Sequence, residues 1–220
     1  MTESLGYSSE SYSYENLMAG DFPVITRPIT LISGQNLDKG TLIGRITKST
    51  GAAVAGTNTG NGVPGTLTAG NDIKLGIYTL TCYNADVSGS EVFNVFDPDG
   101  VRLEDLTIAA AYSNNHFGIT IADGDSDFIV GDTFTVTVSA GSGKYTQALA
   151  ASVDGSQLYE NMCLLGEDGD ASLSDLTTIG WYTGEYNENK VTFGAGLTFA
   201  NSKYELSKYG LHLKAAYQQS

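Results

Sequence analysis

The chain has 220 residues, of which 41% are hydrophobic and 16% charged, and its formal net charge is −14. This apolar content excludes a disordered chain, and the length suits one large domain or two small ones. An acidic surface repels phosphate backbones, which excludes nucleic acid as a partner. Because glycine is abundant (27 residues) and proline scarce (4 residues), alongside many Thr, Ser and Tyr, we expect a mainly β protein.

The charge is unevenly distributed along the chain. Residues 51–140 contain eleven acids against two bases, a net charge of −9. Residues 26–50 instead carry a net charge of +3, from four bases and one acid. The middle of the chain is therefore expected to be a separate piece of protein, solvated by like charge.

Two kinds of hydrophobic segment are missing from the sequence. No run reaches the roughly 18 apolar residues of a membrane-spanning helix. The first residues also lack the basic start and apolar core of a secretory signal. We therefore expect a protein that is made in the cytoplasm and has no membrane partner.

The N-terminal residues 1–20 are rich in Ser, Tyr and Glu and show no pattern that could bury a face. One interpretation is a disordered tail. The other is an arm, residues 1–25, that becomes ordered on a partner. Aromatic and long apolar side chains would anchor such an arm, because they give a large contact area at low entropic cost. The candidate anchors are Tyr7, Tyr12, Tyr14, Leu17 and Met18.

The next segment, residues 26–50, predicts strands and turns. β-prone runs at residues 24–26 and 29–32 each lie beside a proline, Pro23 or Pro28, which suits an edge strand or a strand start. Gly34 and Gly40 are predicted at turns that need unusual backbone angles. Residues 41–47 then predict a further strand.

Residues 51–140 predict an inserted domain. Small residues dominate positions 51–70, which predicts a linker. Four strands are predicted after it, and a strong turn follows the second of them. This spacing favours a small Ig-like β-sandwich. Residues 139–143 predict a second flexible seam, as expected where an inserted unit rejoins its host domain. The predicted strands are residues 77–83, 92–96, 117–121 and 134–138, and the turn is residues 97–100.

The remaining residues, 141–220, complete a body with residues 26–50. Strands are predicted at 161–165, 177–183 and 190–193, and the single tryptophan, Trp181, is expected in the core. Only the C-terminal part looks helical. Asn201 is the N-cap candidate of a short helix and Gly210 is placed to end it.

Residues that could carry catalysis are few. His116 and His212 are predicted to be solvated or packed, and no G-x-S-x-G motif occurs. The glycine-rich residues 141–144 fail the phosphate-loop pattern, because Val138 and Tyr145 stand where that motif needs Gly and Ser or Thr. We therefore expect no enzyme and no cofactor. A hydrolase, the remaining alternative, would need carboxylates gathered in one cleft.

The loop residues Asp123, Asp125 and Asp127 resemble the first ligands of a calcium loop. An EF-hand would need Gly and Glu where Phe128 and Phe134 stand, so the match fails. We interpret this segment as an acidic hairpin loop, with a weak surface calcium site as the alternative.

The two cysteines, Cys82 and Cys163, each lie in an apolar, strand-like run. We interpret both as free, buried thiols. A disulfide between them stays open at the level of sequence.

Two blocks of sequence carry a resemblance to a known family. Residues 29–47 read Ile-Thr-Leu-Ile-Ser-Gly-Gln-Asn-Leu-Asp-Lys-Gly-Thr-Leu-Ile-Gly-Arg-Ile-Thr, and residues 143–157 read Gly-Lys-Tyr-Thr-Gln-Ala-Leu-Ala-Ala-Ser-Val-Asp-Gly-Ser-Gln. Taken together they resemble the lambda-type head decoration proteins of tailed phages, in which the two blocks are nearly contiguous. Residues 193–200 and 210–214 resemble that family's ending. The resemblance covers residues 26–50 and 141–220, and about 90 residues interrupt it.

The resemblance implies a structural virion protein. Such proteins bind the major capsid protein as homotrimers at three-fold sites on the outer capsid surface and stabilise the expanded shell. A loose N-terminal arm that orders on the capsid, which matches residues 1–20, is also typical of the family. The inserted domain, residues 51–140, would then be displayed outward. A second hypothesis is that this domain is an adhesin for cell-surface or mucus glycans.

Overall fold

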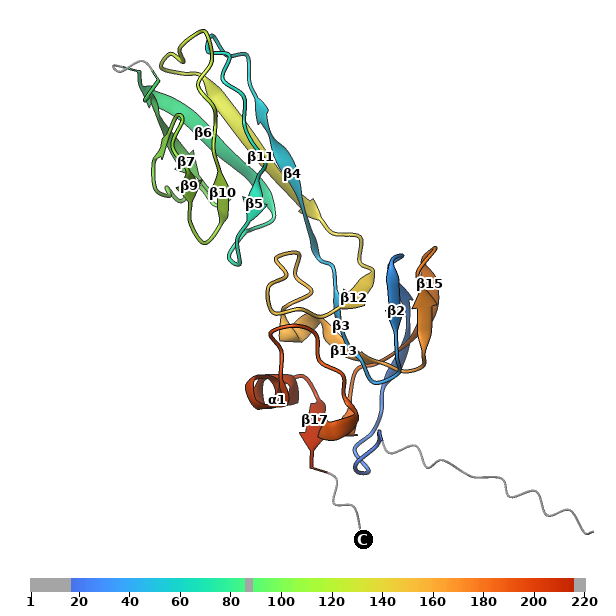
Figure 1. Ribbon diagram of the computed structural model, residues 1–220. Coiled ribbons are helices and arrows are strands. Elements are labelled where there is room, and N and C mark those ends of the chain that lie inside the picture. Colours follow the sequence, from blue (N-terminus) through green and yellow to red (C-terminus); the bar gives the residue numbers. More distant parts are fainter. Residues whose placement is uncertain (1–16, 86–88, 216–220) are drawn as a thin grey trace, which may run out of the picture.

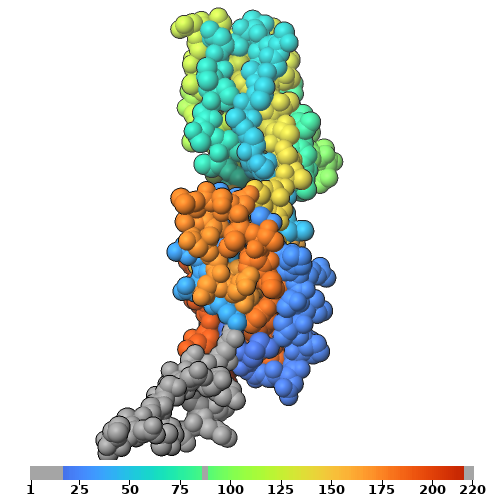
Figure 2. All heavy atoms as spheres, turned by 90° about the vertical axis from the view of Figure 1, so that its right-hand side faces the viewer, coloured from blue at the N-terminus to red at the C-terminus, as the bar shows by residue number. Residues whose placement is uncertain are grey.

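The computed structural model describes residues 17–85 and 89–215. The described chain is mainly β and forms two lobes, one above the other (Figure 1). Residues 48–140 form the upper lobe, which we call the insert, and the residues before and after them form the lower lobe, the body (Figure 2). Each lobe has hydrophobic clusters of its own, with no residue in common. The prediction of a mainly β fold is confirmed.

The body is built on a closed barrel of five strands in the order β1-β12-β3-β13-β15. Ile29, Ile43, Cys163 and Leu165 fill it. The strand β12 follows the insert in sequence, yet it lies between β1 and β3 and pairs with both. The strands are β1 (Thr26–Leu31), β3 (Leu42–Arg45), β12 (Tyr145–Gln147), β13 (Met162–Leu165) and β15 (Leu176–Trp181).

A second layer covers the outer face of β3 and β13. There Leu42, Met162 and Leu164 pack against the C-terminal elements. These are the parallel strands β16 (Gly184–Asn187) and β17 (Leu211–Lys214) and the helix α1 (Phe199–Ser207). The body also contains β2 (Gln35–Leu37) paired with β14 (Gly169–Ala171), and the 3-10 turns η1 (Tyr159–Asn161) and η2 (Glu188–Lys190).

Two local predictions for the C-terminal part are wrong. The N-cap of α1 is Thr198, whose side chain accepts a hydrogen bond from the backbone of Asn201. Asn201 occupies the third helical position and accepts in return from the Thr198 backbone N–H at 2.7 Å, which completes a capping box. The strand predicted at residues 190–193 is instead the end of η2 and a single bridge between Thr192 and Thr41.

The insert consists of two sheets around one core. A five-stranded sheet has the order β4-β11-β6-β7-β8, and a three-stranded sheet has the order β5-β10-β9. Aromatic side chains from both sheets fill the core, among them Tyr78, Phe93, Phe117 and Phe134. The strands are β4 (Lys48–Ala55), β5 (Thr68–Ala69), β6 (Gly76–Asn84), β7 (Val92–Phe96), β8 (Leu106–Thr107), β9 (Tyr112–Ser113), β10 (Phe117–Ile119) and β11 (Thr133–Ala140).

A hydrogen-bonded ribbon joins the two lobes. The backbone N–H of Gly141 donates to the Thr47 carbonyl at 2.9 Å, and that of Gly143 donates to the Ile46 carbonyl at 3.0 Å. These bonds continue the β4–β11 ladder of the insert into the β3–β12 ladder of the body.

The predicted linker at residues 51–70 and the predicted seam at 139–143 are therefore partly wrong. Residues 51–55 belong to β4, and residues 139–140 belong to β11. Small residues have little strand preference of their own, but β11 supplies the paired edge that makes this segment a strand. The insert is held to the body by paired strands.

The helices of residues 17–85 and 89–215 are short. None of them is long and apolar enough to cross a membrane.

Candidate interaction surface

The root of the predicted arm is bound to the body. The Asn187 backbone N–H donates to the Leu17 carbonyl at 2.8 Å, and the Ala19 N–H donates to the Glu185 carbonyl at 2.8 Å. Leu17 is 5% exposed and belongs to the same hydrophobic cluster as β13, β16 and α1. Leu17 was expected to anchor the arm on a partner, but it is instead a core residue of its own chain, because its aliphatic side chain fills the second layer.

The other expected anchors have different positions. Met18 forms a bridge with Tyr186 and is 37% exposed, so its side chain remains open to a partner. Tyr7, Tyr12 and Tyr14 lie outside the described residues. The arm predicted as residues 1–25 is therefore attached to the body from Leu17 onward.

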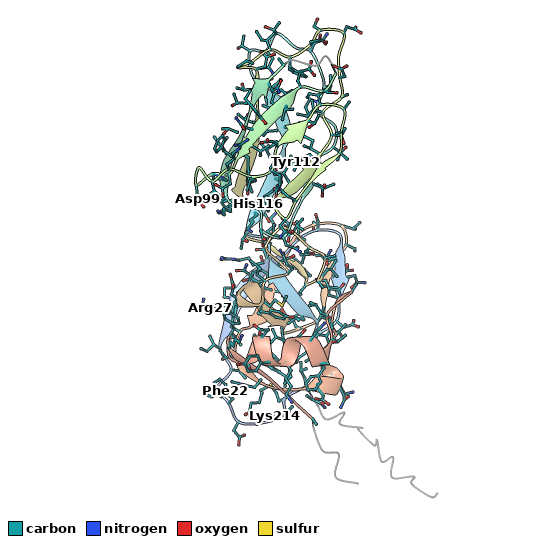
Figure 3. The ribbon with its side chains drawn as sticks, turned by 90° about the vertical axis from the view of Figure 1, so that its left-hand side faces the viewer. Phe22, Arg27, Asp99, Tyr112, His116 and Lys214 are labelled. Carbon is teal, nitrogen blue, oxygen red and sulfur yellow. The ribbon has the colours of Figure 1, made fainter. Side chains whose placement is uncertain are left out.

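Exposed apolar side chains continue along the segment that follows Met18. Phe22, Val24 and Ile25 are each between 37% and 48% exposed. The Phe22 ring meets the His212 ring edge-on, with centroids 4.8 Å apart. Phe22 and Lys214 lie at the end of the body opposite the insert (Figure 3). Exposed apolar groups that follow one another in this way favour a protein contact surface at this end.

A groove lies between α1 and β17 at the same end. Its volume is about 600 Å³. Tyr204, from α1, is 73% exposed and stands at this groove. We call it the α1–β17 groove, and it is lined by Ala200, Lys203, Tyr204, Ser207, His212, Leu213, Lys214 and Ala215.

A polar cluster lies at the end of the insert that faces the body (Figure 3). The Lys74 Nζ is 2.6 Å from Asp97 and 2.7 Å from Asp99. The Lys74 backbone N–H donates to the Tyr78 hydroxyl, which lies 2.9 Å from the Nδ1 atom of His116. Asp97 also accepts from the backbone N–H of Asp99, within the predicted turn at 97–100, and from that of Val101, directly after it. The cluster thus ties this turn to β6 and to the loop before β10.

The Asp97 carboxylate makes the insert sensitive to acid. Its hydrogen bond with the Lys74 ammonium lowers the pKa of Asp97 below its ordinary value of 3.8. A depressed pKa stabilises the fold above the unfolded-state pKa, and this contribution is lost as the pH falls through the folded-state value. We expect the melting temperature of the wild-type insert to fall as the pH drops below 3.8, and Asp97→Asn to melt earlier at neutral pH.

Melting curves of both proteins between pH 7 and pH 2 would check this prediction. Because other insert carboxyls titrate in the same range, only the difference between the two proteins reports on Asp97. The gap in melting temperature should narrow as the pH falls. A constant gap would show that the Asp97 charge contributes nothing.

The acidic loops do not gather into a metal site. No three His, Cys, Asp or Glu side chains in the described parts of the chain are arranged to hold a metal ion. The carboxylates of the turn at 166–170 have structural partners. Glu167 accepts from the Thr178 hydroxyl at 2.9 Å, Asp168 from the Lys39 backbone at 2.8 Å, and Asp170 from Ser172.

The two cysteines are free and buried, as expected, and lie in different lobes. Burial raises the pKa of Cys163 to about 12 and also raises that of Cys82. Because the thiolate is the reactive form, we expect neither thiol to react with iodoacetamide at pH 7.5 in the folded protein. Mass spectrometry should find both modified only after denaturation, and rapid labelling of Cys163 in the folded protein would contradict this.

Sequence reasoning missed both the α1–β17 groove and the Lys74–Asp97 pair. The sequence pattern predicted the turn at residues 97–100. Its partner Lys74 lies 23 residues before Asp97, ahead of β6, so no local pattern links the two. The groove lies between α1 and β17, which the sequence predicts only as a short helix and as the segment that follows it. Neither feature has a local signal.

Comparisons with known proteins show no family for this chain. No family model matches it, and no curated protein matches it. Two crystal structures of FlgL from Xanthomonas campestris are similar over 47% and 49% of this chain and 33% and 32% of FlgL, with 19% identity and TM-scores of 0.33 and 0.32. The matched part spans about a third of FlgL, and at these TM-scores the likeness carries no argument.

Proposed function

We propose that the chain is a structural protein of a phage head, which binds the outer capsid surface at three-fold sites as a homotrimer and stabilises the expanded shell. The observation that carries this proposal is the assembly of the two resembling sequence blocks. Residues 29–47 contribute β1 and β3, and residues 143–157 contribute β12, which lies between them in one barrel. An insertion into a decoration protein would separate the family's two sequence blocks along the chain and leave them packed together in one barrel.

The two ends of the molecule support a division of roles. The exposed apolar residues that follow Met18 and the described ends of the chain lie at the end of the body away from the insert (Figure 1). We assign this end to the capsid. The insert, which we propose to be an Ig-like sandwich, then points outward from the shell. Among the described residues of the insert, the exposed large apolar side chains are aliphatic except Tyr83, which offers little aromatic surface for binding glycans.

The capsid-gripping arm is proposed to be residues 1–16, with Tyr7, Tyr12 and Tyr14 as its anchors. Leu17 is excluded from this role because it is buried in the body. An arm of this kind can add a strand to the edge of a capsid sheet. Many copies on one shell, each in a trimer, would convert modest single contacts into strong attachment.

Removal of residues 1–16 tests the proposal. Wild-type protein should sediment with expanded capsids that lack it, and the truncated protein should remain in the supernatant, with at least a tenfold loss of binding, about 1.4 kcal/mol. Tyr209→Ala, which changes an exposed tyrosine outside the arm, is the matched control and should bind normally. Undiminished binding of the truncated protein would exclude the arm as the grip.

Excision of the insert tests the division of roles. Because Thr47 and Gly141 are hydrogen-bonded neighbours, an Asn-Gly turn can replace residues 48–140. The remaining body should bind capsids as well as the full chain does and should have a trimer mass in light scattering. Loss of capsid binding by a folded body would contradict the proposal. Unchanged attachment of decorated particles to glycan-coated surfaces would argue against the adhesin hypothesis.

A further inference from the structure

The α1–β17 groove has the shape and chemistry of a site for an extended peptide. Within the described residues, β17 pairs with a strand, β16, on one side only. Its residues line the groove opposite α1. Ala200, Leu213 and Ala215 supply apolar surface, and Tyr204 supplies an exposed ring. An open strand edge beside apolar surface is the usual setting for strand addition by a peptide.

The groove is basic, although the chain as a whole has a negative net charge. Residues 199–215 contain three lysines and one glutamate, a net charge of +2, in a chain of net charge −14. Lys203, Lys214 and His212 line the groove, and no carboxylate does. Two of the three lysines have carboxylate partners, Lys214 in Glu185 and Lys208 in Glu205, so among the described residues Lys203 supplies the positive charge of the groove that is not in an ion pair. The groove therefore favours an acidic occupant.

The N-terminal arm begins beside this groove. Leu17 lies opposite Asn187 on β16, and Asn187 lies opposite Lys214 on β17. These three residues form one row across the strands. Two strand spacings, about 10 Å, therefore separate the root of the arm from Lys214. Sixteen residues can extend to about 50 Å, so the arm is long enough to reach around the strand edge and along the groove.

The composition of the arm complements the groove. Residues 1–16 contain three glutamates and no basic side chain. They also contain Tyr7, Tyr12 and Tyr14, whose rings suit an apolar groove with lysine ammonium groups at its rim. The positive charge of the groove and the negative charge of the arm would attract one another at low ionic strength.

We propose that residues 1–16 dock in the α1–β17 groove of their own chain when the protein is free in solution. Docking in the groove does not depend on the capsid grip proposed above, but the two together have a consequence for assembly. If the same arm grips the capsid, the capsid must compete with the groove for it. Docking would then keep an acidic, tyrosine-rich arm from associating with other partners before assembly.

Hydrogen exchange of the full chain and of a variant that lacks residues 1–16 tests the docking without any capsid. We expect backbone amides of α1 and β17 to exchange at least about tenfold more slowly in the full chain, as a docked fraction of about 90% requires. Raising the salt concentration from 50 mM to 500 mM should reduce this protection, because the charges are then screened. Equal exchange in the two proteins at low salt would overturn the proposal.

Substitutions in the groove identify the site. Lys203→Glu combined with Tyr204→Ala should abolish the protection, whereas Tyr209→Ala, an exposed tyrosine that does not line the groove, should retain it. A labelled peptide of residues 1–16 should bind the truncated protein and fail to bind the truncated double variant. Equal peptide binding by both proteins would overturn the assignment to this groove.

Two other occupants are outcomes of the same measurements. Mixed oligomers of isotope-labelled truncated chain and unlabelled full chain separate docking within one chain from docking on a second copy: slowed exchange of α1 and β17 in the truncated subunits would mean that the arm docks on a neighbouring copy, and this would overturn the proposal. Protection that survives removal of residues 1–16 but is lost on removal of residues 216–220 would assign the groove to the C-terminal residues. Protection that depends on residues 1–16 and is confined to the full-length subunits of such mixed oligomers supports the proposal.

Discussion

Phe134→Ala is expected to destabilise the insert by about 3–5 kcal/mol and to leave the body unchanged. Phe134 is fully buried, and its ring lies 5.7 Å from Phe93 and 5.6 Å from Phe128, measured between centroids. Truncation therefore leaves a cavity beside the Phe93 and Phe128 rings of the insert core. None of these residues belongs to a cluster of the body.

Two probes separate the lobes in this measurement. Trp181 is the only tryptophan, and it packs against the body cluster, so its fluorescence reports on the body alone. Hydrogen exchange of β6, β7 and β11 reports on the insert. Phe134→Ala should lower the denaturant midpoint of the insert and leave the Trp181 midpoint in place, and Val54→Ala, at an exposed position, should move neither. A matched fall in both midpoints would show that the ribbon makes the lobes one cooperative unit.

Gly44→Ala is expected to destabilise the body by roughly 3 kcal/mol. Gly44 lies in β3, where the chain of residues 154–157 crosses closely, and an added Cβ would stand 2.0 Å from the Ser156 carbonyl oxygen. The Ser156 backbone cannot rotate away from the added Cβ, as a flexible side chain could. The crossing segment also holds the start of the ribbon, because the Thr47 and Lys48 N–H groups donate to Asp154.

Gly34→Ala is the matched control for this substitution. Gly34 has a φ of +88° but no atom near the added Cβ, so alanine there costs only the left-handed conformation, roughly 1–2 kcal/mol. The Trp181 fluorescence midpoint in a denaturant titration should therefore fall further for Gly44→Ala than for Gly34→Ala. A smaller loss at Gly44 would show that residues 154–157 move aside without cost.

Local patterns predicted much of the strand content. The predicted strand at residues 92–96 is β7, and the runs at 77–83 and 134–138 lie within β6 and β11. These segments alternate apolar and polar side chains, which is the period of a half-buried strand. The turn at residues 97–100 and the left-handed glycines Gly34 and Gly40 were also predicted, because turn chemistry acts over four residues or fewer.

Other elements depended on distant partners. β4 contains Gly or Ala at four of its eight positions, so its composition predicts a linker, and it becomes a strand because β11 pairs along its length. The parallel pairings of β1 with β12 and of β16 with β17 join segments with no sequence signal for each other. Such long-range pairings leave no periodic pattern in the sequence, so the fold is needed to identify them.

The features of the candidate surface also fall into those that the sequence predicts and those that depend on the fold. Charge and aromatic content are properties of composition, so the amino-acid sequence was enough to show that an acidic, tyrosine-rich segment precedes the first strand. The fold was needed to show that this segment is bound from Leu17 onward and starts two strand spacings from a strand that lines a basic groove. The reason is physical: burial of Leu17 and the closeness of Lys214 arise from strands that pair across the whole body, and no property of residues 1–25 alone specifies them.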